Sequence, residues 1–317
     1  MKRLMVWGAA VTCVGAMVGA SSVVAGAAQA PAPAAPAAID FSKVEITTTK
    51  FGSNFYAIDG SGGRMGALVG PDGVFVVDAQ YAQLTDKLVA AINKVSGGEK
   101  IRLLVNTHVH PDHTSGDENF GKMGVTILSR TNLRKRLAEP VAGANGRPAM
   151  PHAALPIITY DAPLQIHMDG EDIQIIPLPP AHTDGDTAVK FPGADVLMTG
   201  DVFRSIGFPN IDLANGATLK GMLDALQMLV DAAGPNTTIV PGHGDITNKA
   251  ALVTHRAMAV TVRDRVAKLI KDGKTQEQAI AAKPTADFDA KVGNAAASAD
   301  RFVTQVYTEL KRTNATK

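Results

Sequence analysis

Cysteine is almost absent from this chain of 317 residues, and its single copy is Cys13. Cys13 lies in an apolar N-terminal segment, so the rest of the chain can form no disulfide and offers no thiolate ligand to a metal. Aromatic residues are also scarce, at 5%. A chain of this length nevertheless buries most of the surface of its unfolded state in its own core, so it needs no disulfides to fold.

Neither sign of charge dominates the sequence, which has 31 basic and 30 acidic residues. Lys2 and Arg3 belong to the N-terminal segment, and without them the acidic residues outnumber the basic ones by one. A nearly neutral protein lacks the basic surface with which proteins bind nucleic acids. We therefore expect a small-molecule substrate and no nucleic-acid partner. The sequence leaves the oligomeric state open.

The N-terminus has the three parts of an export signal. Two basic residues come first, residues 4–24 are apolar and uncharged, and residues 28–30 (Ala-Gln-Ala) have the form of a cleavage site. Pro31 disfavours a cut directly before it, so the cleavage position stays open, as does an uncleaved membrane anchor. We predict a signal peptide over 1–30 and a periplasmic or secreted protein with no stable membrane insertion after cleavage.

A Pro/Ala-rich linker over 31–42 separates the predicted signal from the rest of the chain. Beyond it, short apolar segments that end in turns alternate with segments of helical spacing, such as 84–95. This alternation predicts an α/β protein whose strands are covered by outer helices. We predict a single domain over 43–317 that ends in a helical extension, which includes 298–310.

Three histidines and an aspartate follow one another closely in the segment His-Val-His-Pro-Asp-His, which begins at His108 and ends at His113. The apolar residues 101–105 before it predict a buried strand, and the turn-forming residues after it predict a loop. In an extended segment His108 and His110 share a face, so both imidazoles can bind one metal ion. Asp112 and His113 can then reach a second ion nearby.

This segment resembles the His-x-His-x-Asp-His signature of the metallo-β-lactamase superfamily. Three further motifs are similar to that family's: His182 in Ala-His-Thr-Asp-Gly-Asp, Asp201 in Met-Thr-Gly-Asp, and His243 in Val-Pro-Gly-His-Gly. Their order and spacing agree with the family across residues 43–271. The resemblance implies an α/β fold of the αββα type, a four-layer sandwich in which two mixed β-sheets are flanked by helices.

The resemblance also implies seven metal ligands, three for each of two ions and one that bridges them. The ligands of the first ion would be His108, His110 and His182, those of the second Asp112, His113 and His243, and the bridge Asp201. Each ion keeps an open position, as catalytic sites do and structural zinc sites do not. Nitrogen and oxygen ligands without sulfur suit Zn²⁺, which we expect twice per chain, and they leave Fe and Mn open.

Two such ions lower the pKa of a shared water, which gives a metal-bound hydroxide as nucleophile. Asp112 would be the catalytic residue, because it can orient this hydroxide and pass a proton to the leaving group. We predict hydrolysis of a small ester, a lactone or a β-lactam-type amide, which agrees with export. Thioester and phosphodiester hydrolysis stay open, because the aspartate at position 201 is similar to that of family members with those activities.

An iron-dependent oxidoreductase similar to the persulfide dioxygenases of the same superfamily is a further alternative. Those enzymes use fewer metal ligands, whereas all seven are retained here. A non-catalytic binding module would tolerate the loss of ligands, and none is lost. Metal content separates the two enzymes, since one iron per chain favours the oxygenase and two zinc ions favour the hydrolase.

Four other polar residues receive supporting or structural roles. Asp78, at the end of an apolar strand, resembles the family's aspartate that orients the first histidine loop from behind the ligands. His152, in a Pro-rich segment over 138–159 expected to be a long loop, and His167, in a hairpin, are expected on the surface. His255 lies in a long predicted helix. It is expected either at the surface or packed against neighbouring side chains, and not as a metal ligand.

Overall fold

The computed structural model describes residues 39–142 and 146–315. The predicted signal peptide over 1–30 and the linker as far as residue 38 therefore lie outside the described residues. The last linker residues enter the short 3-10 helix η1 (Phe41–Lys43), where the ring of Phe41 meets that of Tyr81 edge-on at 5.3 Å. Within the described part of the chain, no helix is both long enough and apolar enough to span a membrane.

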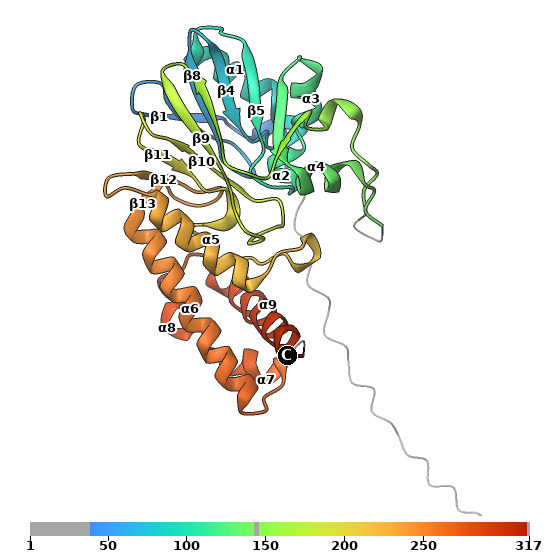
Figure 1. Cartoon of the computed structure of the whole chain (residues 1–317), viewed down its shortest axis with the longest axis vertical. Helices are drawn as coiled ribbons and strands as arrows, with labels where there is room; N and C mark the ends of the chain where they lie inside the picture. Colours follow the sequence, from blue (N-terminus) through green and yellow to red (C-terminus); the bar gives the residue numbers. More distant parts are fainter. Residues whose placement is uncertain (1–38, 143–145, 316–317) are drawn as a thin grey trace, which may run out of the picture. The chain divides into compact units, whose positions relative to one another are not determined.

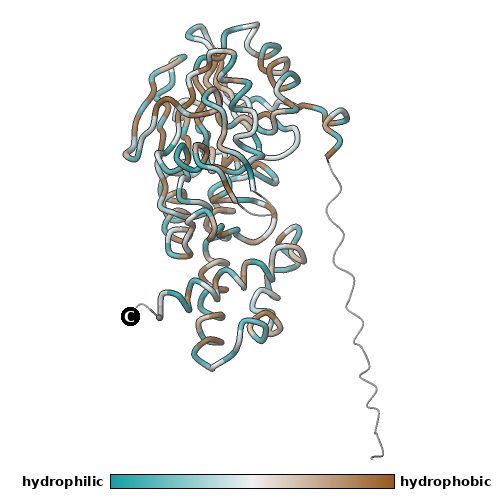
Figure 2. The backbone as a smooth tube through the Cα atoms, turned by 90° about the vertical axis from the view of Figure 1, so that its right-hand side faces the viewer, coloured by the Kyte–Doolittle hydropathy of each residue, from teal (hydrophilic) through white to brown (hydrophobic). Residues whose placement is uncertain are grey.

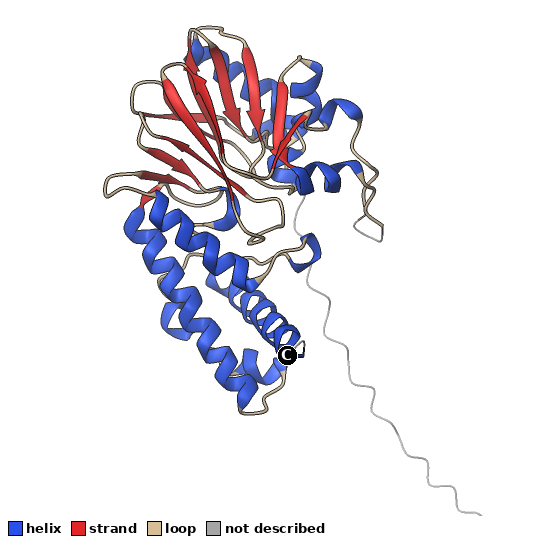
Figure 3. Cartoon of the chain, viewed as in Figure 1, coloured by secondary structure: helices blue, strands red, loops and turns tan. Residues whose placement is uncertain are grey.

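Two β-sheets form the centre of the fold (Figure 3). The first sheet has the strand order β1-β2-β3-β4-β5-β6-β7 and the second β13-β12-β11-β10-β9-β8. Both are mixed, because β4 to β7 are parallel neighbours, as are β11 and β12, whereas the other neighbours are antiparallel. The strands are β1 (Thr47–Phe51), β2 (Phe55–Asp59), β3 (Met65–Gly70), β4 (Gly73–Val77), β5 (Ile101–Val105), β6 (Thr126–Arg130), β7 (Ile158–Tyr160), β8 (Leu164–Met168), β9 (Glu171–Pro177), β10 (Thr187–Phe191), β11 (Val196–Met198), β12 (Thr238–Val240) and β13 (Thr247–Asn248).

Helices cover the outer face of each sheet, so the predicted αββα sandwich is confirmed (Figure 1). Helices α1 and α3 pack on the first sheet, and α5, α6 and α9 lie together on the side of the second. The helices are α1 (Thr85–Ser96), α2 (Pro111–Thr114), α3 (Asp117–Lys122), α4 (Thr131–Ala138), α5 (Leu219–Ala232), α6 (Lys249–Lys271), α7 (Gln276–Ala281), α8 (Ala286–Asp289) and α9 (Ala295–Ala315). The predicted helix over 249–271 coincides with α6, and 298–310 lies within α9.

The alternation of side chains along each strand sorts the apolar residues into three layers. In β4, Val74 and Val76 face the helices, whereas Phe75 and Val77 face the opposite sheet. Both faces of the strand are therefore buried, which explains why its sequence is apolar throughout. In Figure 2, brown apolar segments alternate with teal hydrophilic ones along the backbone tube.

Five strands end close to the candidate ligands. Strand β4 leads to Asp78, β5 to the segment that contains His108, and β11 to Asp201. Strand β9 precedes His182, and β12 precedes His243. Because both sheets contribute these strand ends, the ligand-bearing loops meet where the sheets face each other, as the sequence predicts.

Two strands differ from the prediction. Strand β7 begins inside the segment over 138–159 that was expected to be a loop, and it pairs in parallel with β6. Its Tyr160 is buried, and the phenol hydroxyl lies 2.9 Å from Thr187 Oγ1 of the second sheet. The second is β13, which the sequence does not predict and which pairs with β12 at the edge of the second sheet. Both missed strands are too short to show a periodicity, and pairing with a neighbour creates them.

We expect Phe191→Ala to destabilise the protein by about 3–5 kcal/mol, because Phe191 is fully buried between the sheets. Its ring centroid lies 4.6 Å from that of Phe55 and 6.1 Å from that of Phe75. Urea unfolding measures the change in free energy. Val253→Ala on α6 is the control, since Val253 is 47% exposed and should change stability by less than about 0.5 kcal/mol. Equal losses in both variants would contradict this placement of the core.

Candidate metal centre

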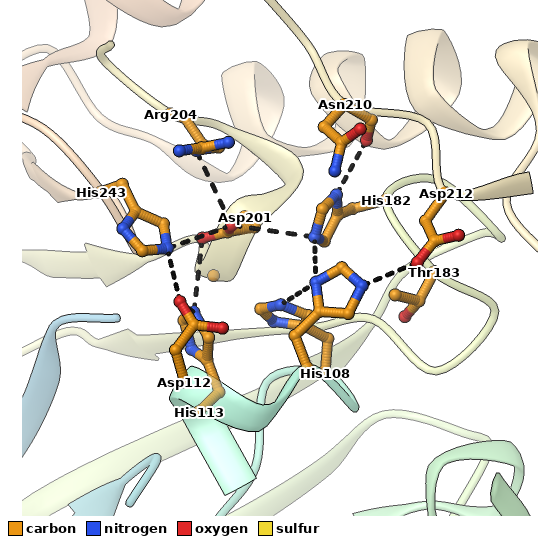
Figure 4. Close-up of polar contacts among 12 residues, drawn as sticks. His108, Asp112, His113, His182, Thr183, Asp201, Arg204, Asn210, Asp212 and His243 are labelled. Carbon is orange, nitrogen blue, oxygen red and sulfur yellow. Dashed lines mark hydrogen bonds and ion pairs between the residues drawn. The ribbon is translucent and has the colours of Figure 1, made fainter. Parts of the chain in front are cut away.

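All seven predicted ligands meet at one end of the sandwich (Figure 4). Their donor atoms form three overlapping groups, and within each group all donor atoms lie within 4.8 Å of one another. The groups are His108, His110 and His182; His108, His113 and Asp201; and Asp112, His113 and His243. The first and third groups are the two sets of three that the sequence motifs suggest, and the second group links them.

The first group contains three imidazoles whose ring nitrogens converge. His110 Nδ1 lies 3.2 Å from His108 Nε2 and 2.9 Å from His182 Nε2. Burial lowers the pKa of His182 to about 4 and holds the pKa of His108 well below its ordinary value. Both rings are therefore neutral at physiological pH, which is the form of imidazole that binds metals.

The third group, Asp112, His113 and His243, combines a carboxylate with two imidazoles. Asp112 Oδ2 lies 3.1 Å from His243 Nε2 and 3.8 Å from His113 Nε2. Asp112 and His113 belong to α2, which begins with Pro111 at a position where no amide donor is needed. His243 comes from the loop after β12, so two distant segments build this group.

Asp201 lies between the two groups. Its Oδ1 is 3.5 Å from His113 Nε2, and its Oδ2 is 3.3 Å from His243 Nε2 and 3.7 Å from His182 Nε2. Asp201 Oδ1 and His113 Nε2 are both buried without a hydrogen-bond partner in the described structure. Buried polar atoms are normally satisfied, and cations between the groups would satisfy these two. The donor set therefore fits a pair of divalent ions.

The charges within the site link the binding of a metal ion to the release of a proton. Burial by itself would lower the pKa of His113, but Asp78 and Asp201 outweigh it and raise the pKa well above its ordinary value. Burial would raise the pKa of Asp201, yet His113 and His243 hold it well below the usual range. The carboxylates of Asp78 and Asp201 thus favour the protonated form of His113, and a bound cation would have to displace that proton.

Hydrogen bonds behind the ligands orient three of the histidine rings. His182 Nδ1 donates to the carbonyl oxygen of Asn210 at 2.7 Å, and His110 Nε2 donates to Asp212 Oδ2 at 2.7 Å. His113 Nδ1 lies 2.7 Å from Asp78 Oδ2. Each bond occupies the outward nitrogen of the ring and leaves the other nitrogen directed into the site, so it selects the ligating tautomer.

The predicted role of Asp78 is confirmed by its contacts. Asp78 has a left-handed backbone conformation, with φ of 64°. Its Oδ1 accepts the backbone N–H of Thr107 at 2.7 Å, and its Oδ2 accepts the hydroxyl of Thr107 at 2.8 Å as well as the bond from His113. One carboxylate therefore fixes both the start of the histidine segment and its last ligand.

Asp186 holds the loop that carries His182. Its carboxylate accepts the backbone N–H groups of His182 at 2.7 Å and Thr183 at 3.0 Å, and the Thr183 hydroxyl at 2.7 Å. Burial raises the pKa of Asp186 to about 7 in spite of these hydrogen bonds. The sequence motif contains this residue, but its pattern alone did not indicate that it folds the loop back on itself.

Two glycines let the backbone come close to the ligands. A Cβ atom at Gly63 would lie 2.1 Å from the ring of His113, and one at Gly242 would lie 2.1 Å from Asp201 Oδ1. Gly63 also donates its N–H to the carbonyl oxygen of Asp112 at 3.1 Å. Any side chain at either position would displace a donor atom of the site.

Asn210 and Asp212, which contact His182 and His110, are among the residues around the site that sequence analysis missed. Both lie in the loop after β11, many residues away in the sequence from the histidines they contact. No motif or spacing rule connects them to His110 or His182. The other histidines lie where they were expected. His152 and His167 are exposed, and His255 is packed edge-on against Phe203 with ring centroids 5.1 Å apart.

Comparisons with known proteins agree with this geometry. The sequence profile described as "Metallo-beta-lactamase superfamily" matches residues 58–243. A probable metallo-hydrolase of Methanocaldococcus jannaschii is 26% identical over 166 residues, which cover 49% of this chain and 76% of that protein.

Solved structures share the fold. A metallo-beta-lactamase from Pontibacter korlensis superposes with a TM-score of 0.58 at 18% identity, covering 68% of this chain and 99% of its own. The DIM-1 metallo-beta-lactamase gives 0.57 at 21% identity, covering 69% and 99%. Since the profile match includes every one of the seven donors and spans more than half of the protein, the chain belongs to the metallo-beta-lactamase superfamily, as a metallo-hydrolase with a β-lactamase-like fold.

Proposed function

We propose that this protein is an exported hydrolase that uses two zinc ions per chain to cleave a small ester, a lactone or a β-lactam-type amide. The observation that carries the proposal is the division of seven nitrogen and oxygen donors into two groups of three with Asp201 between them. A site for a single ion would need only one such group. Export is supported by the sequence pattern of residues 1–30.

Two divalent ions in these groups would lower the pKa of a shared water and polarise the scissile carbonyl. As part of this proposal, we assign the proton transfer to Asp112. Its side chain is 20% exposed, whereas that of Asp201 is 5% exposed, so Asp112 borders the side from which substrate enters. We propose that its carboxylate orients the attacking water, takes up its proton and returns it to the leaving group.

Arg204 suggests that the substrate carries an anionic group. Its Nε lies 3.7 Å from Asp201 Oδ2 and is buried without a hydrogen-bond partner in the described structure (Figure 4). Asp201 is the one acid within ion-pair distance of Arg204 among the described residues, and it is also a candidate metal ligand. If Asp201 binds a metal ion, the guanidinium of Arg204 is free to bind a carboxylate of the substrate. Arginine commonly binds carboxylates in proteins.

Metal analysis followed by a substrate panel tests the proposal, and His110→Ala is the key variant. The wild type should contain two zinc ions per chain and hydrolyse a member of a panel of β-lactams, lactones, esters, thioesters and phosphodiesters. His110→Ala should lower kcat/KM by more than about 100-fold, since it removes a ligand rather than a contact behind one. Its circular dichroism spectrum should stay unchanged, because a loop ligand contributes little packing.

Unaltered turnover by His110→Ala would remove the assignment of the site. One iron per chain in the wild type, together with oxygen consumption in place of hydrolysis, would instead identify a dioxygenase. Hydrolysis confined to thioesters or phosphodiesters would overturn the proposed ester and amide substrates while preserving the two-metal site.

Asp201→Ala should lower the metal content from two ions to about one per chain, because Asp201 is the one carboxylate among the described residues that lies within 4 Å of histidine nitrogens of both groups. Inductively coupled plasma mass spectrometry of the purified variant measures the stoichiometry. Asp161→Ala, which changes an exposed aspartate paired with Arg130, is the control and should keep both ions. Two tightly bound ions in Asp201→Ala would contradict the bridging role.

Arg204→Met should raise the KM for a substrate with a free carboxylate by about 10- to 100-fold, since a hydrogen bond to a charged group is worth about 1.5–3 kcal/mol. Steady-state kinetics with the free acid and with its neutral methyl ester, on the same variant, measure the effect. The KM of the ester should not change, nor should the metal content. A rise of equal size for acid and ester would show that Arg204 does not bind the substrate anion.

A further inference from the structure

The loop that follows Asp201 supports two ligands of the first metal group. The carbonyl oxygen of Asn210 accepts the bond from His182, and the carboxylate of Asp212 accepts the bond from His110. The backbone N–H of Asp212 also donates to the carbonyl oxygen of His182 at 3.0 Å. The positions of residues 210–212 thus determine how two of the three imidazoles are oriented.

Residues 210–212 are in turn held by helix α9. Gln305 Oε1 accepts the backbone N–H of Ile211 at 3.0 Å, and Gln305 Nε2 donates to Asn210 Oδ1 at 2.9 Å. The side chain of Gln305 therefore makes two hydrogen bonds to the loop, one to Asn210 and one to the adjacent Ile211. Both ends of the amide group are engaged, which restricts Asn210 and Ile211 to one arrangement relative to the helix.

Helix α9 also holds the same loop at Phe208, two residues before Asn210. Ser298 Oγ accepts the backbone N–H of Phe208 at 3.0 Å, and the ring of Phe208 stacks on that of Phe302, with centroids 6.1 Å apart and planes 12° from parallel. Ser298, Phe302 and Gln305 are spaced by four and three residues, so they share one face of α9. This face lies along the loop from 208 to 211.

Helix α9 lies beyond the segment that matches the family profile, which ends at residue 243. The similar solved structures are covered at 97–99% of their length by 68–69% of this chain. The contacts that α9 makes to the histidine loop therefore come from a part of this chain that the family profile does not match.

We propose that Gln305 is a positioning residue for the first metal group, acting through Asn210 and Asp212 on the rings of His182 and His110. This inference rests on the proposed metal-dependent function. Without the two bonds from Gln305, the loop can shift, and the outward nitrogens of both histidines lose their fixed acceptors. Contacts behind metal ligands typically change affinity by about 10- to 100-fold.

Gln305→Met tests the proposal, because methionine has a similar length and lacks both polar atoms. We expect the dissociation constant of one of the two zinc ions, measured by competition with a fluorescent chelator, to rise about tenfold while the other stays constant. In the cobalt-substituted protein, the visible d–d absorption should change in intensity or position. Neither readout requires an active enzyme or a known substrate.

Gln278→Met on α7 is the matched control. The side-chain Oε1 of Gln278 accepts the backbone N–H of Thr275 at 3.1 Å in the cap of α7, away from the histidine loop, and the backbone N–H of Gln278 donates to Thr275 Oγ1 at 3.3 Å. This control removes the side-chain hydrogen bond and should therefore lose some unfolding stability in urea while it keeps both zinc affinities and the cobalt spectrum. Gln305→Glu should restore the affinity, because its carboxylate still accepts from Ile211 and Asn210 can rotate to donate its amide.

Zinc affinities of Gln305→Met that equal those of the wild type, with a loss of stability like that of Gln278→Met, would show that Gln305 is only structural. Failure of Gln305→Glu to restore the affinity would overturn the role of the two hydrogen bonds. A wild type that binds no metal would overturn the proposed function itself. If the wild type binds two ions and Gln305→Met binds both with unchanged affinity, this inference is overturned and the proposed function stands.

Discussion

A buried cluster of imidazoles and carboxylates constrains the whole structure. Asp201 and His113 each have an inward-facing atom that is buried without a hydrogen-bond partner among the described residues. Taking such groups out of water costs free energy unless charge of the opposite sign compensates it. In the metal-free protein, protonated His113 between Asp78 and Asp201 provides part of this compensation. A pair of cations would complete it, and this is the physical reason why the donor set indicates a metal centre.

The sandwich meets this constraint by bringing strand ends from both sheets together. The backbone N–H of Thr187 in β10 donates to the carbonyl oxygen of Thr107 at 2.8 Å and so connects the second sheet to the start of the histidine segment. Between the sheets, Phe191, Phe55 and Phe75 pack in contact and keep the layers in register. Rigid packing below the site lets loops above it hold donors at fixed separations, although loops alone are mobile.

Around the ligands, contacts from neighbouring segments fix the direction of each ring. Asp78 orients His113, and residues 210–212 orient His110 and His182. The C-terminal helices thereby become part of the site rather than an appendage, because α9 contacts the loop from Phe208 to Ile211. The orientation of these histidine rings is therefore connected to the packing of a helix that lies outside the residues matched by the family profile.

Periodicity in the sequence was enough to predict the longer strands and helices. The sandwich, the seven candidate donors and the place of Asp78 behind them followed from the resemblance of the motifs to one family, and the fold brings those donors together. Strands β7 and β13 could not be predicted in this way, because two or three residues become a strand only through pairing with their neighbours in the folded sheet. Folding also determines which residues form hydrogen bonds with the histidine rings. Asn210, Asp212 and Gln305 are ordinary polar residues in the sequence, and they acquire a role only because folding brings a distant loop and helix α9 beside the histidines.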